Sequence, residues 1–191
     1  DPIPMTREGT GVGSPAWSPD GRWLTFTATI EGGDGEDDAK SQVWALDRRG
    51  GEAQPITEVE QGIQGYLWSP DGSRLLLRIR DEEAKDSSWT SDRPEPWVID
   101  RLQIKRDRIG YLTDTRKTHL YVLDVATKEL TQVTAGDYDE SAPAWSPDGR
   151  WIAFSSNRTE DPDANSDSNL WIVSADVDEP VTEPRQLTTY D

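Results

Sequence analysis

The hydrophobic and polar positions of this chain form short apolar runs, each of which ends in the same tight turn. The turn sequence is Trp-Ser-Pro-Asp-Gly, found at 17–21, 68–72 and 145–149. Pro presets φ at the first central position, Asp bonds back to the backbone, and Gly accepts a positive φ. Alternating, β-prone runs follow the turns at 23–28, 75–79 and 151–155. The pattern therefore predicts strand, turn, strand in three places.

Two more strands complete each unit. A third apolar run lies at 42–46, 119–123 and 169–173, and the fourth strand ends in an apolar residue and Thr at 57, 134 and 188. Eleven residues separate Thr57 from Trp68, and the same spacing separates Thr134 from Trp145. Because Thr6 precedes Trp17 by this distance as well, residues 1–14 are interpreted as the outer strand of a preceding unit with its connecting loop.

Four short antiparallel strands repeated about every 50 residues are typical of a β-propeller blade. We therefore predict an all-β propeller fragment: three four-stranded antiparallel blades plus the outer strand of a preceding blade. Blade 1 spans 15–57, blade 2 spans 64–134 with an insertion at 81–118, and blade 3 spans 141–188. Three blades are too few for a propeller of about 4–8 blades, so we expect an excerpt of a longer chain. A homodimer that closes a ring is the alternative.

Composition sharpens this picture through its tryptophans. The 191 residues include nine Trp and two Phe. Seven Trp fall at repeat positions, where we expect them to fill the space between blades rather than bind a ligand. They are Trp17, Trp23, Trp44, Trp68, Trp145, Trp151 and Trp171.

Charge and cysteine content exclude several functions. With 37 acidic and 20 basic residues the net charge is −17, which argues against nucleic-acid binding because that affinity comes from Lys and Arg. The absence of Cys excludes disulfides, Cys-ligated metals and thiol catalysis. The apolar runs are too short for a membrane span. The long loops at 30–41, 81–118 and 157–168 join second to third strands, so we expect them on one electronegative rim.

Candidate chemistry within the chain is sparse. His119 is the single His, and the segment Gly11-Val12-Gly13-Ser14-Pro15 lacks the G-x-S-x-G frame of a nucleophile elbow. We therefore interpret His119 as structural. Oxygen-bearing residues alternate along 161–167 as in calcium loops, but Ser166 and Ile172 stand where an EF-hand needs Gly and Glu. A polar loop is the favoured interpretation and a metal loop the alternative. We assign no catalytic, cofactor-binding or metal-binding residue.

The repeats resemble the TolB and WD40-like propeller repeats of the prolyl oligopeptidase family of serine peptidases. The insertion and its flanks are similar to the acylaminoacyl-peptidase branch. The matching segments are Arg93-Pro94, Val98 to Arg101, Lys105 to Asp107, Gly110-Tyr111, His119 to Asp124, Gly136 to Asp139 and Ser156 to Thr159.

This resemblance implies a non-catalytic propeller whose parent carries a C-terminal α/β-hydrolase domain. In the family that domain supplies Ser, Asp and His, while the propeller caps the active site and admits short or N-acylated peptides. None of the triad positions lies in this chain, which we expect to be inactive alone. The implied partners are the hydrolase domain and a peptide substrate, without nucleic acid or membrane. A homo-oligomer is a further expectation, and the expected compartment is the cytoplasm.

A second hypothesis is a TolB-like propeller that binds partner proteins and carries no enzyme. The sequence that follows residue 191 distinguishes the two hypotheses. Further blades and then a G-x-S-x-G segment would favour the peptidase.

Overall fold

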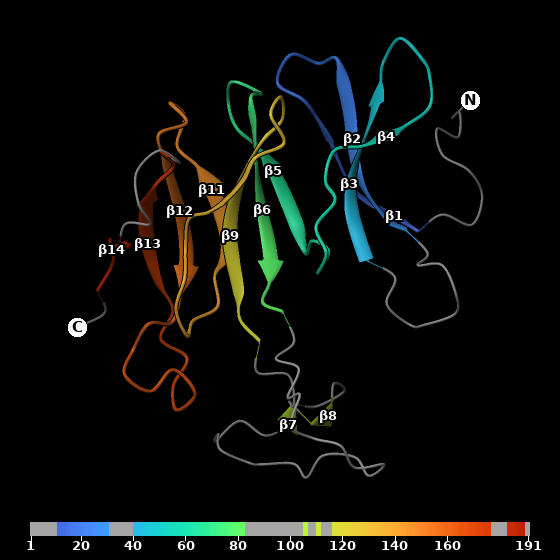
Figure 1. The fold of residues 1–191 in the computed structure, drawn as a ribbon. Coiled ribbons are helices and arrows are strands. Elements are labelled where there is room, and N and C mark those ends of the chain that lie inside the picture. The colour runs from blue at the N-terminus through green and yellow to red at the C-terminus, as the bar shows by residue number, and fades with distance from the viewer. Residues whose placement is uncertain are drawn as a thin grey trace, which may run out of the picture.

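The computed structural model describes residues 11–30, 40–82, 105–106, 110–111, 116–176 and 183–189. These residues form three four-stranded antiparallel sheets that stand side by side, and a small hairpin lies below the middle sheet (Figure 1). The described part contains no helix, and so none long and apolar enough to cross a membrane. The all-β prediction of three four-stranded blades is confirmed.

Each sheet keeps the strand order of a blade. Blade 1 contains β1 (Val12–Trp17), β2 (Trp23–Ile30), β3 (Lys40–Asp47) and β4 (Gln54–Pro55). Blade 2 contains β5 (Gly65–Trp68), β6 (Arg74–Arg80), β9 (Thr118–Asp124) and β10 (Leu130–Gln132). Blade 3 contains β11 (Ser141–Trp145), β12 (Trp151–Ser156), β13 (Asn169–Ser174) and β14 (Arg185–Gln186).

One strand boundary in the structure differs from the sequence prediction. Strand β1 begins at Val12, three residues before the boundary placed at Pro15. Within the predicted insertion, β7 (Lys105–Arg106) and β8 (Gly110–Tyr111) pair as an antiparallel hairpin. The predicted outer strand at residues 1–6 lies outside the described residues, as does most of the insertion.

The repeated turn closes through its Ser and Asp side chains. In blade 1 the Ser18 hydroxyl donates to Asp20 Oδ1 at 2.6 Å, and the amide of Trp23 donates to Ser18 Oγ at 2.9 Å. The amide of Arg22 donates to the same Asp20 oxygen at 3.0 Å, and Gly21 adopts a φ of 66°. Blades 2 and 3 repeat the Ser-to-Asp bond at 2.6 Å. This local network closes the turn between the first and second strands of each blade.

Successive turns lie against each other along one end of the sheets. A Cβ placed on Gly72 would lie 3.3 Å from Cδ of Pro19 in the preceding turn. A Cβ on Gly149 would lie 3.7 Å from Cδ of Pro70. The turn Gly of blade 2 and that of blade 3 therefore each face the turn Pro of the blade before.

Apolar side chains fill the spaces between neighbouring blades. The first core joins blades 1 and 2 and includes the fully buried Val43, Leu75 and Leu77. The second core joins blades 2 and 3, and Leu120 and Phe154 are among its buried residues. Four of the seven repeat Trp pack on these cores as predicted, namely Trp23, Trp68, Trp145 and Trp171. Trp44 packs on a smaller cluster within blade 1, and Trp151 departs from the prediction because it is 41% exposed. The faces at the two ends of the described fold are more open, with Trp17 53% and Leu170 48% exposed.

The Thr that ends each unit has a defined contact. Thr57 Oγ1 accepts the amide N–H of Val43, and Thr134 Oγ1 accepts that of Leu120, both at 2.9 Å. Thr188 Oγ1 accepts the amide of Leu170 at the same distance. Thr57 and Thr134 are almost completely buried. The Thr found by its spacing thus ties the outer segment to the third strand of its own blade.

Candidate functional site

The described loop 157–168, which joins β12 to β13, extends from the end of the molecule opposite the turns (Figure 1). In blade 2 the base of the insertion is closed by its own backbone. The amide of Asp81 donates to the carbonyl of Lys117 at 2.8 Å, and the amide of Lys117 donates to Asp81 Oδ2 at 3.3 Å. These bonds place the Asp81 carboxylate beside the start of β9.

His119, the second residue of β9, is buried at this base with 2% of its surface exposed. Its Nδ1 lies 2.8 Å from Glu140 Oε2, and its Nε2 lies 3.5 Å from Asp81 Oδ1. Each ring nitrogen therefore faces a carboxylate. Because neither nitrogen is open to a reacting group, this geometry supports a structural role for His119.

Glu140 connects this histidine to blade 3. It is completely buried just before β11, and its amide donates to the carbonyl of Thr118. One carboxylate oxygen accepts the Thr134 hydroxyl at 3.0 Å in addition to facing His119. The other accepts Arg158 Nη2 at 2.5 Å. A buried carboxylate with partners on both oxygens keeps its charge at a much lower cost than an unpaired one.

Arg158 lies between this carboxylate and a set of aromatic rings. Its side chain is 8% exposed. The guanidinium carbon is 4.9 Å from the ring centre of Tyr138, 5.4 Å from that of Trp171 and 5.6 Å from that of Phe154. Cation–π contacts at these distances stabilise a partly desolvated guanidinium. We call Asp81, His119, Glu140 and Arg158 the charged cluster.

The charged cluster changes the titration of His119. Burial by itself lowers the pKa of the imidazole, because it disfavours the charged form. The hydrogen bond to Glu140 and the negative charges of Glu140, Asp81 and Asp139 outweigh burial, so the pKa of His119 is raised above its ordinary 6.5.

The predicted calcium-like loop is organised by two asparagines. Asn157 Nδ2 donates to Asn165 Oδ1 at 2.9 Å, and Asn165 Nδ2 donates to Thr159 Oγ1 and to the carbonyl of Asp161. These Asx-type bonds fit the polar-loop interpretation. Among the described residues, no group of three or more His, Asp or Glu is placed to hold a metal ion.

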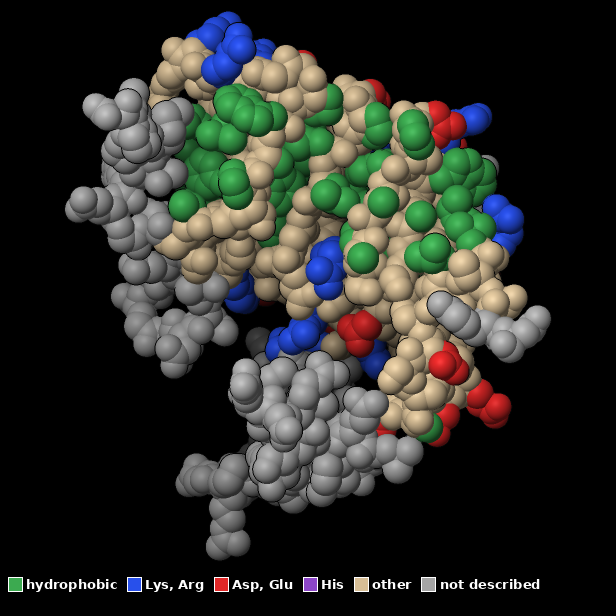
Figure 2. Space-filling model, turned by 180° about the vertical axis from the view of Figure 1, so that it is seen from behind, with side chains coloured by type: hydrophobic (Ala, Val, Ile, Leu, Met, Phe, Trp, Pro, Cys, Tyr) green, Lys and Arg blue, Asp and Glu red, His purple; other side chains and the backbone are tan. Residues whose placement is uncertain are grey.

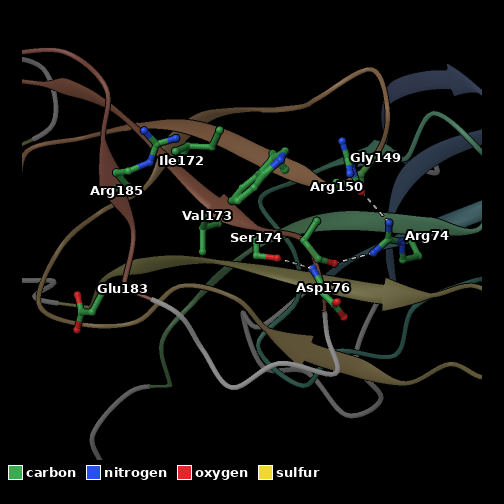
Figure 3. Close-up of a pocket in the computed structure, with 11 residues that line it drawn as sticks. Arg74, Gly149, Arg150, Ile172, Val173, Ser174, Asp176, Glu183 and Arg185 are labelled. Atoms are coloured by element: carbon green, nitrogen blue, oxygen red, sulfur yellow. Dashed lines mark hydrogen bonds between the residues drawn. The ribbon is translucent and has the colours of Figure 1, made fainter.

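A cavity of about 560 Å³ lies at the opposite, turn-bearing end, between the turn of blade 3 and β13 (Figure 3). Arg74 reaches across from blade 2 and donates to the carbonyls of Gly149 at 2.8 Å and Ala175 at 2.7 Å. Its guanidinium also lies 5.0 Å from the ring centre of Trp145. Arg74 occupies the repeat position of Trp23 and Trp151, and this departure from the repeat is the sequence signal that marks it.

The charge is unevenly distributed over the surface. Seen from behind, acidic side chains lie at the loop-bearing end among several Lys and Arg side chains, and apolar side chains cover much of the face above (Figure 2). Acidic residues also dominate the described loop that holds Asp161, Asp163 and Asp167. Such a rim favours cationic groups over anionic ones.

Known proteins are similar to this chain in both sequence and fold. No family model matches the chain. It is 35% identical over 175 residues to the uncharacterized peptidase YuxL of Bacillus subtilis, across 90% of this chain and 26% of that protein. The chain therefore spans about a quarter of the length of this relative. It is a homologue of one segment of a peptidase.

Solved structures support the fold independently. The Pyrococcus horikoshii acylaminoacyl peptidase matches 93% of this chain and 25% of its own, with a TM-score of 0.61 and 19% identity. TolB from Acinetobacter baumannii matches 94% of this chain and 33% of its own, with a TM-score of 0.52 and 17% identity. These likenesses confirm a β-propeller fragment.

Proposed function

We propose that this chain is part of the non-catalytic propeller of a serine peptidase. In this proposal the propeller covers the active site of a C-terminal α/β-hydrolase domain in the same longer protein. It admits short or N-acylated peptides and excludes folded proteins. The observation that carries the proposal is the 35% identity to a peptidase over 90% of the chain.

The geometry is consistent with a supporting rather than a catalytic role. The single His of the chain has a carboxylate at each ring nitrogen, so neither nitrogen is available to take a proton from a nucleophile. The loop 157–168 and the base of the insertion lie at the same end, which is the surface that we propose a second domain contacts. The turn-bearing end, in contrast, is regular.

The test uses the full-length protein that contains this chain. We expect a reagent that modifies active-site serines to label it, and we expect a short N-acylated peptide to be cleaved. The same peptide sequence placed within a folded protein should resist cleavage. Absence of labelling would overturn the peptidase assignment. Equal cleavage of both substrates would overturn the size restriction alone.

The second candidate is a TolB-like module that binds partner proteins without an enzyme. The fold shared with TolB over 94% of the chain favours it. A full-length protein that closes its propeller and has no G-x-S-x-G segment would support this candidate. Cell fractionation would test the proposed cytoplasmic location.

A further inference from the structure

The two described blade junctions use equivalent positions in different ways. At the junction of blades 1 and 2 the position of His119 is occupied by Gln42, which is 4% exposed. Its Oε1 accepts the Thr57 hydroxyl at 2.7 Å and the amide of Val59 at 3.0 Å. Its Nε2 donates to the carbonyl of Val59 at 2.7 Å. We call Gln42 with its partners Thr57 and Val59 the Gln42 hub. It carries no charge at any ordinary pH.

The junction of blades 2 and 3 keeps the Thr but replaces the neutral hub by ionisable groups. Asp81 faces His119 from the end of β6, and Asp139 and Glu140 face it from the segment before β11. Arg158, which follows β12, binds the far oxygen of Glu140, and Lys117 binds Asp81 through its backbone. A neutral imidazole has one donor and one acceptor nitrogen, whereas the imidazolium donates from both. Two facing carboxylates therefore match the charged ring.

We propose that His119 is a proton-dependent clamp between blades 2 and 3. Its imidazolium binds Glu140 and so holds the segment that leads into β11 against the start of β9. When the ring loses its proton, Nδ1–H still donates to Glu140, but the charge attraction is lost and Nε2 becomes an acceptor opposite Asp81, so the clamp weakens. The neutral Gln42 hub leaves the junction of blades 1 and 2 unaffected. The proposal is independent of whether the protein is a peptidase.

The direction of the pH effect follows from linkage. The folded-state pKa of His119 is raised above 6.5, so the stabilisation is complete below pH 6.5. It is lost as the pH rises through the raised value. For each pKa unit of elevation, the closing equilibrium of the junction changes about tenfold.

The first measurement uses the unaltered 191-residue chain, whose single His gives one set of imidazole NMR signals. We expect a midpoint above 6.5 and, below that midpoint, protons on both ring nitrogens. A midpoint at or below 6.5 would overturn the proposal.

The second measurement compares two equivalent amides by hydrogen exchange. The amide of Glu140 donates to the carbonyl of Thr118 at 2.9 Å, and the amide of Ile63 donates to that of Ser41 at 2.8 Å. After correction for intrinsic exchange, protection of Glu140 should fall as His119 loses its proton, and protection of Ile63 should stay constant. His119→Gln copies the blade 1 hub and should abolish the pH dependence at Glu140. Equal behaviour of the two amides in the unaltered chain, or an unchanged response in the variant, would contradict the clamp.

Discussion

The hydroxyl of Thr25 in blade 1 accepts the indole N–H of Trp68 in blade 2 at 3.0 Å. The same hydroxyl accepts the Tyr66 phenol at 3.0 Å and donates to the carbonyl of Ala16. Thr25→Val keeps the shape and leaves both donors without this acceptor. We expect a loss of about 1–3 kcal/mol in the free energy of unfolding, measured by denaturant titration. Thr131→Val, at a half-buried site in β10, is the control and should change stability by less than about 0.5 kcal/mol.

The buried Thr of each unit should matter in proportion to its burial. Thr57→Val removes the acceptor of the Val43 amide in a site that is 2% exposed, so we expect a loss of about 1–3 kcal/mol. Thr188→Val removes the same bond in blade 3, where the Thr is half-buried and water can replace the hydroxyl. In thermal melting, Thr57→Val should have a lower melting temperature than Thr188→Val. Equal melting temperatures would contradict this reasoning.

Arg74 contributes through two backbone carbonyls of the neighbouring blade. Arg74→Met keeps much of the side-chain volume and removes both donors, so we expect a loss of about 1.5–3 kcal/mol. The matched change Arg150→Met breaks an ion pair with Asp148 whose side chains are 78% and 46% exposed. That pair should contribute less than about 1 kcal/mol. Similar effects of the two substitutions would show that Arg74 acts only as a surface charge.

Acid should loosen the turns within a defined pH window. The Ser69 hydroxyl and the amide of Ser73 bind the Asp71 carboxylate and lower its pKa from 3.8 to about 2. A lowered folded-state pKa means that the stabilisation is present above pH 3.8 and disappears as the pH falls toward 2. Urea titrations at several pH values should show this decline in the unaltered chain and a smaller one in Asp71→Asn. A parallel decline in both would disprove the contribution of Asp71.

The strands and turns were accessible from sequence because their signals are local. Ser69, Pro70, Asp71 and Gly72 make a turn from their own side chains and backbone, and an apolar, β-prone run follows each turn. The spacing of Thr57 from Trp68 located the end of each unit correctly for the same reason, since each blade repeats the same contacts. Strand β1 starts earlier than predicted because Val12 and Gly13 pair with Ala28 and Thr27 across a bulge that the sequence does not display.

The charged cluster could not be predicted from local sequence patterns. His119 appears in the sequence as an isolated residue on an apolar strand, and its partners Asp81, Glu140 and Arg158 are 38, 21 and 39 positions away. The pairing of β6 with β9 brings Asp81 to His119, and the packing of blade 3 on blade 2 adds Glu140 and Arg158. Arg74 could be predicted only in part. The sequence shows that it replaces the repeat Trp, but its contact with the carbonyl of Ala175 depends on the fold.

The contacts between successive turns also limit which sequence changes this protein can accept. A side chain at Gly72 would meet the ring of Pro19, and its φ of 72° already excludes most residues. The Trp-Ser-Pro-Asp-Gly turn of blade 2 therefore tolerates little variation in either length or residue type. The opposite end accepts loops of very different lengths without disturbing the spacing of the sheets. New binding properties can arise there by insertion, while the contacts between successive turns are kept at the other end.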